Sequence, residues 1–156
     1  MTKTTPISRL SELASSYAAT IDGPFKFRSK SRSAHKLHST DDFEVWLLAW
    51  LPGQSTDLHD HGGDAAPAPS AFTMISGELT EYTVSPGFPP TLNRQVLGTG
   101  ETSVVDSQTV HAVKNRGDRP AVSVHVYAPA LTLMRRYLFD ESGLWLAALR
   151  RAGEDW

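Results

Sequence analysis

The chain contains no cysteine, which excludes disulfide bonds and thiolate metal ligands. It has no stretch near the roughly 18 apolar residues of a transmembrane helix, and the opening MTKTTPISRL lacks the apolar core of a signal peptide. Neither sign of charge predominates, because 15 basic and 17 acidic residues give a net charge of -2. Such a balance provides no basic surface for nucleic acid and no strong attraction to membranes. We therefore expect a cytoplasmic monomer that binds neither nucleic acid nor membrane.

The composition is typical of one globular domain. The 156 residues are 40% hydrophobic and 21% charged, which is enough apolar material for a single core. The sequence shows no internal repeat and no low-complexity segment. Residues 1–156 are therefore predicted to form a single domain.

A short helix is predicted near the start of the chain, because apolar residues recur there at helical spacing. These residues are Ile7, Leu10, Leu13, Ala14 and Tyr17. Thr5 is placed to cap the helix, with Pro6 at its first position. Residues 25–42 are polar and show no pattern that predicts strands, and His35 and His38 within them are expected to face solvent.

From residue 43 onward the pattern changes to short strands separated by turns. Segment 43–50 is apolar on both faces, which indicates a strand buried on both sides. Further strands are predicted at 71–76, 79–84, 92–97, 102–105, 110–114 and 121–127. Residues 115–118 are predicted to join the last two as a hairpin loop. Segment 131–138 can extend the sheet, and 143–152 can form a short helix or a closing strand. Short strands at this spacing predict an all-β barrel or sandwich.

Two histidines, His59 and His61, stand two residues apart after the turn signal Pro52-Gly53. Residues i and i+2 of a strand point to the same face, so both imidazoles can reach one metal. His111, at the start of a later predicted strand, can add a third imidazole. Three ligands on one side of an octahedral ion leave positions open, which indicates catalysis or ligand binding. Because these ligands are neutral, the ion would attract a thiolate, a carboxylate or a hydroxide.

A polar row, Ser123, His125 and Tyr127, alternates with valines along the predicted strand 121–127. If the valines face the core, the polar row lies on the surface. If the valines instead pack beneath a covering helix, the row lines the barrel interior, where its members need hydrogen bonds. A relay beside a metal would supply them, with the Tyr127 hydroxyl, oriented by His125, donating to a bound substrate or oxygen species.

Several segments between residues 43 and 130 resemble the cupins. Two groups of residues resemble the two cupin motifs. The group that resembles the first motif is Gly53, His59, His61 and Gly77, and the group that resembles the second is Gly100, His111 and Asn115. The glutamate that usually follows the paired histidines is missing, and in this the chain is similar to the thiol dioxygenases. The pairing of HDHGG with a distant SVHVYAP resembles the cysteine dioxygenase family in particular. The resemblance implies an all-β cupin fold, a double-stranded β-helix or jelly-roll barrel, with a short N-terminal helix.

The same resemblance implies the site and the reaction. It implies Fe(II) as the cofactor, with the metal ligands His59, His61 and His111. It implies a catalytic relay made of Ser123, His125 and Tyr127, with Tyr127 also contacting substrate. The substrates would be a small thiol and O2, and both oxygen atoms would end on sulfur as a sulfinic acid. Holding both reactants at neighbouring positions replaces a bimolecular encounter by proximity.

The chain departs from the family in three ways. Some members link a cysteine to the relay tyrosine, but this chain has no cysteine and carries Ala66 near that position, so Tyr127 is expected to act unmodified. The loop DAAPAPS is longer than in related sequences. The family also binds the substrate carboxylate through an upstream arginine, and the corresponding RSAHKLHS offers Lys36 as first candidate, with His35 or Arg32 as alternatives. L-cysteine is therefore the expected substrate, with 3-mercaptopropionate and cysteamine as alternatives.

Two other functions also agree with the sequence. One is a different metal-binding cupin, such as an isomerase or a dioxygenase of a non-thiol substrate, since three histidines also suit zinc. The other is a cupin that binds or senses a small molecule without catalysis.

Overall fold

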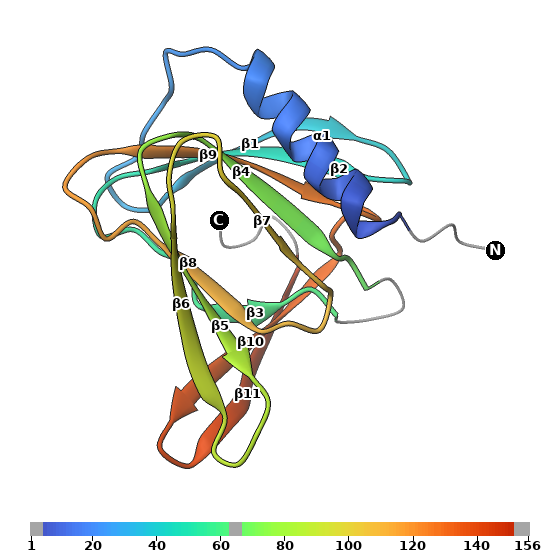
Figure 1. The fold of residues 1–156 in the computed structure, drawn as a ribbon, viewed down its shortest axis with the longest axis vertical. Coiled ribbons are helices and arrows are strands. Elements are labelled where there is room, and N and C mark those ends of the chain that lie inside the picture. The colour runs from blue at the N-terminus through green and yellow to red at the C-terminus, as the bar shows by residue number, and fades with distance from the viewer. Residues whose placement is uncertain (1–4, 63–66, 152–156) are drawn as a thin grey trace.

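The computed structural model describes residues 5–62 and 67–151, which form one helix and eleven strands (Figure 1). The helix α1 spans Ile7–Thr20. The first strands are β1 (Ser33–Ser39), β2 (Glu44–Trp50), β3 (Leu58–Asp60), β4 (Ser70–Ser76), β5 (Leu79–Ser85) and β6 (Thr91–Leu97). The remaining strands are β7 (Thr102–Val105), β8 (His111–Lys114), β9 (Ala121–Tyr127), β10 (Leu133–Asp140) and β11 (Gly143–Arg151). Among the described residues, no helix has the length and apolar character that a membrane span requires.

The strands form two antiparallel sheets. One sheet has the order β1-β2-β9-β4-β7, and the other has the order β11-β10-β3-β8-β5-β6. Because successive side chains of a strand point to opposite faces, each sheet turns one set of residues inward. The largest apolar cluster, which includes Trp46, Leu48, Trp50 and Phe72, fills part of the interior. The all-β architecture predicted from the strand spacing is therefore confirmed.

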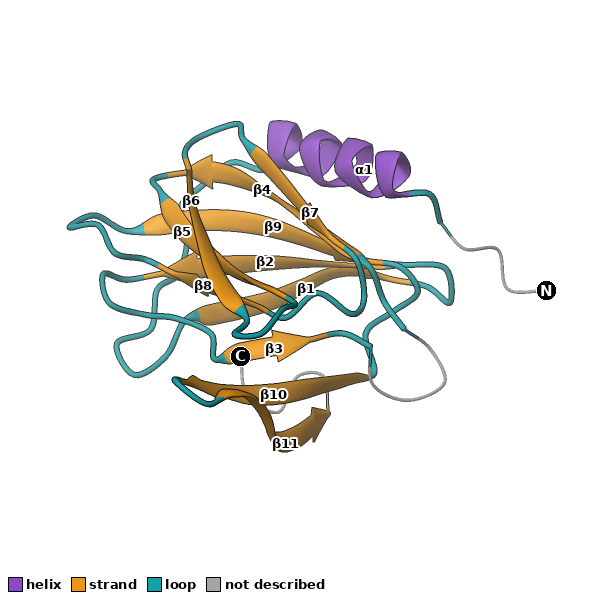
Figure 2. Ribbon diagram, turned by 60° about the horizontal axis from the view of Figure 1, so that its bottom comes forward, coloured by secondary structure: helices purple, strands orange, loops and turns teal. Residues whose placement is uncertain are grey.

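The helix α1 covers the outer face of the five-stranded sheet (Figure 2). Its buried residues Leu10 and Ala14 share an apolar cluster with Val45, Val124 and Val126. The valines of β9 therefore pack beneath a covering helix, and the polar row on the same strand faces the interior. The helix begins differently from the prediction. Pro6 takes the N-cap position with no side-chain cap, so the expected cap by Thr5 was wrong.

Strand β1 was not predicted, because it is polar and lies at the edge of its sheet. It pairs only with β2 among the described strands, and its register shifts between Lys36 and His38. An edge strand with one half-exposed face needs few apolar residues, so its sequence carries little signal. Segment 143–152, which the sequence left open, forms the closing strand β11 as far as Arg151 and pairs with β10.

The loop after β8 is not a hairpin loop, which corrects the prediction for residues 115–118. Strand β8 pairs with β3 and β5 in one sheet, whereas β9 pairs with β2 and β4 in the other. The loop therefore crosses between sheets. Asn115 anchors it from a fully buried position by donating from Nδ2 to the carbonyls of Trp50 and Arg119. Turn-forming residues mark such a loop but do not reveal which sheet the next strand joins.

Candidate metal centre

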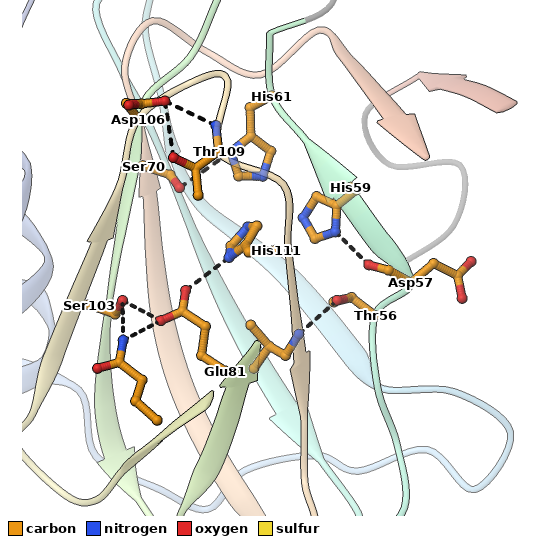
Figure 3. A network of polar contacts seen from close by, with 12 residues as sticks. Thr56, Asp57, His59, His61, Ser70, Glu81, Ser103, Asp106, Thr109 and His111 are labelled. Carbon is orange, nitrogen blue, oxygen red and sulfur yellow. Dashed lines mark hydrogen bonds and ion pairs between the residues drawn. The ribbon is translucent and has the colours of Figure 1, made fainter. Parts of the chain in front are cut away.

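Three histidines from neighbouring strands meet in the interior of the barrel (Figure 3). His59 lies in β3, His61 follows directly after it, and His111 is the cross-strand partner of His59 on β8. The ring centroids lie 4.6 Å apart for His59 and His111, and 5.0 Å apart for His59 and His61. One ring nitrogen from each histidine lies within 4.8 Å of the other two. The sequence predicted these three residues together, and the structure brings them together.

The outer ring nitrogen, Nδ1, of each histidine is held by a hydrogen-bond partner. His59 Nδ1 lies 2.8 Å from the carbonyl oxygen of Asp57, and His111 Nδ1 lies 2.9 Å from Oε1 of Glu81. Both acceptors call for a proton on Nδ1, which in a neutral ring leaves the Nε2 lone pair available to a metal. His61 Nδ1 lies 3.4 Å from the hydroxyl of Ser70.

The Nε2 atoms of His61 and His111 are buried and have no hydrogen-bond partner among the described residues. Burial also lowers the pKa of His59 and of His61, and the charges of the neighbouring histidines lower both further. Arg32 and Arg136 add to the lowering for His59. Neutral imidazoles with unpartnered lone pairs are what a divalent metal ion requires, so this group fits a metal.

Glu81 completes the surroundings of His111, and the sequence analysis missed it. Its side chain is fully buried and accepts hydrogen bonds from Ser103 Oγ and, at 2.7 Å, from Gln95 Nε2. Burial alone would raise the pKa of Glu81, but the hydrogen bonds, above all the one with His111, bring the pKa below its usual value. An ionised carboxylate behind a histidine fixes the ring's orientation and raises its basicity as a ligand. Only knowledge that β5 pairs with β8 could have revealed this contact.

A second buried carboxylate, Asp60, lies between the two paired histidines in sequence. It receives bonds of 2.9 Å from both Nε and Nη2 of Arg135, and one of 2.7 Å from the hydroxyl of Tyr137. The same bonds connect β3 to β10, and these two strands also pair through their backbones. A Cβ on Gly62 would stand 2.8 Å from the backbone oxygen of Ser107 as well as 2.8 Å from Arg135 Nη2, so glycine is needed there for close approach. This clamp fixes the strand that carries His59, and no sequence motif pointed to it.

The polar row of β9 lies buried across the interior from these histidines. Trp50 Nε1 donates to Ser123 Oγ at 2.9 Å, and Ser123 Oγ lies 2.8 Å from His125 Nε2. The Ser123 hydroxyl therefore contacts both the indole of Trp50, from which it accepts, and the imidazole of His125. Burial lowers the pKa of His125 to about 3, so this imidazole is neutral at physiological pH. Burial raises the pKa of Tyr127, and Glu44 raises it further, so the phenol keeps its proton.

A pocket opens beside the metal centre and the polar row. His59, His111, His125 and Tyr127 all line it, so the two predicted groups of residues share one cavity. The Tyr127 ring also meets the His61 ring edge-on, with centroids 5.1 Å apart.

Two arginines line the same pocket, but Lys36, the first candidate for binding a carboxylate, does not. Lys36 is half-exposed, with Nζ 3.5 Å from Glu44 Oε2 and 5.0 Å from the ring centre of Trp46. Arg32 donates to the carbonyl of Ser55 at 2.9 Å and lies over the Trp50 ring at 5.5 Å. The geometry therefore favours Arg32 over Lys36.

The remaining candidates from the sequence lie away from the site. His35 is exposed, and His38 is half-buried against the ring of Phe43 at 4.7 Å, so neither belongs to the three-histidine group. Ala66, the residue near the position of the family's linking cysteine, lies outside the described residues, as do the other residues of the DAAPAPS loop before residue 67.

The fold and the three buried histidines together define a cupin, a double-stranded β-helix barrel with a candidate metal centre inside. The chain is similar in structure to TT1209 from Thermus thermophilus, with a TM-score of 0.58 and 19% identity over 68% of this chain and 90% of that one. It is also similar to a conserved protein with a double-stranded β-helix domain from Klebsiella pneumoniae, with a TM-score of 0.55, 24% identity and coverage of 79% and 90%. A Cupin 2 conserved barrel domain protein from Leptotrichia buccalis gives a TM-score of 0.54 at 16% identity, covering 67% of this chain and 44% of that one. These similarities establish the fold.

The family follows from the sequence match. Residues 8–142 match the family cysteine dioxygenase type I. The chain therefore belongs to this family, as its motifs suggested.

Proposed function

We propose that this protein is an iron(II)-dependent thiol dioxygenase that converts a small carboxylate-bearing thiol, with L-cysteine as the first candidate, to its sulfinic acid. The observation that carries the proposal is the shared pocket, which His59 and His111 of the three-histidine group line together with His125 and Tyr127 of the polar row, in a chain of the cysteine dioxygenase type I family. The ligand set contains no carboxylate, so a bound thiolate would balance the charge of the ion.

The residues around the pocket have distinct roles in this proposal. His59, His61 and His111 would hold the metal, and iron(II) bound there would supply the redox chemistry that joins a thiolate to O2. The thiol and O2 combine without another co-reactant, because sulfur provides all the electrons that O2 takes up. The Tyr127 hydroxyl, which keeps its proton, would donate a hydrogen bond to the bound reactants.

Within the relay, Ser123 and His125 would position Tyr127. The bond from Trp50 to Ser123 fixes the hydroxyl of Ser123, and that hydroxyl fixes the ring of His125. A neutral His125 between the serine and the tyrosine holds one orientation without adding charge to the pocket. Arg32 would bind the substrate carboxylate with its planar guanidinium, which matches a carboxylate with two parallel bonds.

An oxygen-electrode screen tests the proposal. Iron-loaded protein is offered L-cysteine, 3-mercaptopropionate and cysteamine, and thiol-dependent O2 uptake is recorded beside sulfinate formation. Uptake with sulfinate is expected for the thiols that carry a carboxylate. Zinc-loaded protein and the His111→Ala variant serve as controls and should be inactive. If no thiol is oxidised by fully iron-loaded protein, the proposed function is wrong, and another metal cupin becomes the better interpretation.

A further inference from the structure

The strand β11 ends the six-stranded sheet with an exposed apolar run. Among the described strands it pairs with β10 alone. Its residues 144–149 read LWLAAL, a run without charge, proline or glycine. Trp145, Leu146 and Leu149 are each more than half exposed. Single exposed apolar residues are common on protein surfaces, but a continuous exposed run on one strand indicates a site of interaction.

The exposed apolar side chains lie on both faces of β11. Trp145 is the cross-strand partner of Leu138, and Leu146 is the partner of Tyr137. Because neighbouring residues of a strand point to opposite faces, Trp145 and Leu146 lie on opposite sides of the sheet. Such a pattern is typical of a strand with neighbours around it. Strand β11 instead lies at the end of the molecule opposite α1 (Figure 2).

The other edges of the two sheets are protected. Strand β1 carries Lys36 and a register shift, and β6 carries Arg94 in its middle. Strand β7 is four residues long, and α1 lies against it. Charges, irregularities, short length and a covering helix are the usual features that keep a strand edge from pairing with another chain. Strand β11 has one of these, a bulge at Ala147, within an otherwise regular pairing with β10.

The charges at the two ends of β11 are complementary to each other. Asp140 and Glu141 precede the strand, and Arg150 and Arg151 end it. When two copies of such a strand pair antiparallel, the acidic start of each copy lies beside the basic end of the other. Parallel pairing would bring like charges together. The edge is therefore complementary to itself about a two-fold axis, which is the symmetry of most dimers of identical chains.

We propose that the edge of β11 is a dimer interface whose partner is a second copy of this chain, paired antiparallel through β11 across a two-fold axis. The six-stranded sheets of the two copies then form one continuous sheet, and the apolar side chains of each β11 lie alongside those of the other. The expectation of a monomer rested on composition, which does not show which strand ends a sheet. The interface is independent of the proposed function, because no residue of β11 lines the pocket beside the metal centre.

Sedimentation velocity of the full chain, in a dilution series up to about 100 μM, measures the assembly state. The wild type should sediment with twice the mass of the chain at the upper concentrations. Leu146→Lys places a charge on the edge of both copies, so the dissociation constant should rise by about a hundredfold. Leu92→Lys, on an exposed leucine of the edge strand β6, is the matched control and should leave it unchanged. Circular dichroism establishes that each variant is folded, and Ala147→Lys replaces Leu146→Lys if that variant is not.

A charge exchange tests the antiparallel arrangement. Glu141→Lys brings a lysine beside the arginines of the second copy, so the dissociation constant should rise by about tenfold. The double variant Glu141→Lys with Arg150→Glu exchanges the two signs and should restore most of the lost affinity. Glu101→Lys, on an exposed glutamate outside β11, is the control and should have no effect.

The outcomes are distinct. A dimer that Leu146→Lys dissociates, that Leu92→Lys leaves intact and that the charge exchange restores supports the interface. A wild type that stays monomeric at about 100 μM overturns it. A dimer that Leu146→Lys does not weaken overturns it as well, because that dimer uses another surface. Assemblies larger than a dimer, or a double variant that binds no more tightly than Glu141→Lys, overturn the antiparallel two-fold pairing.

Discussion

The imidazole of His111 is held from behind by Glu81, whose Oε1 lies 2.9 Å from Nδ1 in a contact between two buried side chains. The carboxylate orients the ring so that Nε2 points to the place where the three histidines converge. It also stabilises positive charge on the imidazole, which strengthens the ring as a metal ligand. The candidate metal centre therefore depends on an acid that does not itself belong to the ligand set.

Replacing Glu81 tests this dependence. Glu81→Gln keeps the volume but removes the charge behind His111, so iron(II) and zinc affinity should fall by about 10- to 100-fold. Competition with a chromophoric chelator measures both affinities. Glu101→Gln, on an exposed glutamate, is the matched control and should leave them unchanged. Unchanged affinity in Glu81→Gln would mean that Glu81 has only a packing role.

The Tyr127 hydroxyl should matter for turnover and not for the fold. Tyr127→Phe removes one hydrogen-bond donor from a buried pocket, so iron content should stay normal while turnover falls by about 10²-fold or more. Metal analysis and steady-state O2 uptake measure the two quantities. Tyr82→Phe on β5 provides the control hydroxyl deletion, with turnover within about twofold of wild type. Normal turnover in Tyr127→Phe would remove Tyr127 from the relay.

The metal-free protein should lose stability as the pH falls. Burial lowers the pKa of His59 and His61, and lowers the pKa of His125 to about 3, whereas the unfolded chain binds these protons near pH 6.5. The native state thus binds fewer protons than the unfolded state. The contribution of these groups to stability is full above about pH 6.5 and is lost progressively below it, by about 1.4 kcal/mol per pH unit for each histidine.

Urea unfolding of the metal-free protein at several values between about pH 7.5 and about pH 5 measures how the free energy of unfolding changes with pH. His125→Asn should reduce the slope by about one proton, while substitution of the exposed His35 by Asn should not change it. A flat profile for the wild type would show that the buried histidines do not resist protonation.

The Asp60 clamp should contribute to stability. Asp60→Asn keeps the shape but turns an amide group toward donors of Arg135 and Tyr137, so the free energy of unfolding should fall by about 2 kcal/mol. Chemical denaturation measures it. Asp118→Asn in an exposed loop is the control and should change it by less than about 0.5 kcal/mol. An equal effect in both variants would show that the clamp is energetically unimportant.

Much of the site was predictable because its residues are marked by local periodicity. The two-residue spacing of His59 and His61 predicts that both reach one site, and Ser123, His125 and Tyr127 alternate on β9. The two possible orientations of β9 were resolved only by α1, which packs on its valines. Local pattern specifies which residues share a face, but not which element covers that face.

The features that sequence could not supply depend on pairing between distant segments. Glu81 meets His111 because β5 lies beside β8, and Arg136 faces the pocket because β10 lies beside β3. The sequence ranked Lys36 above Arg32 as the cation for the substrate carboxylate, whereas in the structure Arg32 and not Lys36 lines the pocket. The position of a residue in or beside the polar edge strand does not show that Arg32 reaches the pocket or that Lys36 pairs with Glu44.

The central claim is that the three histidines hold iron(II) for the addition of O2 to a thiol. Isotope labelling tests it most directly: iron-loaded protein is given a thiol under ¹⁸O2, and the product is examined by mass spectrometry. The account predicts a sulfinate in which both added oxygen atoms carry the label, formed by wild-type protein and absent with His111→Ala. A product that takes oxygen from water, a disulfide as the only product, or undiminished sulfinate formation by His111→Ala would contradict it.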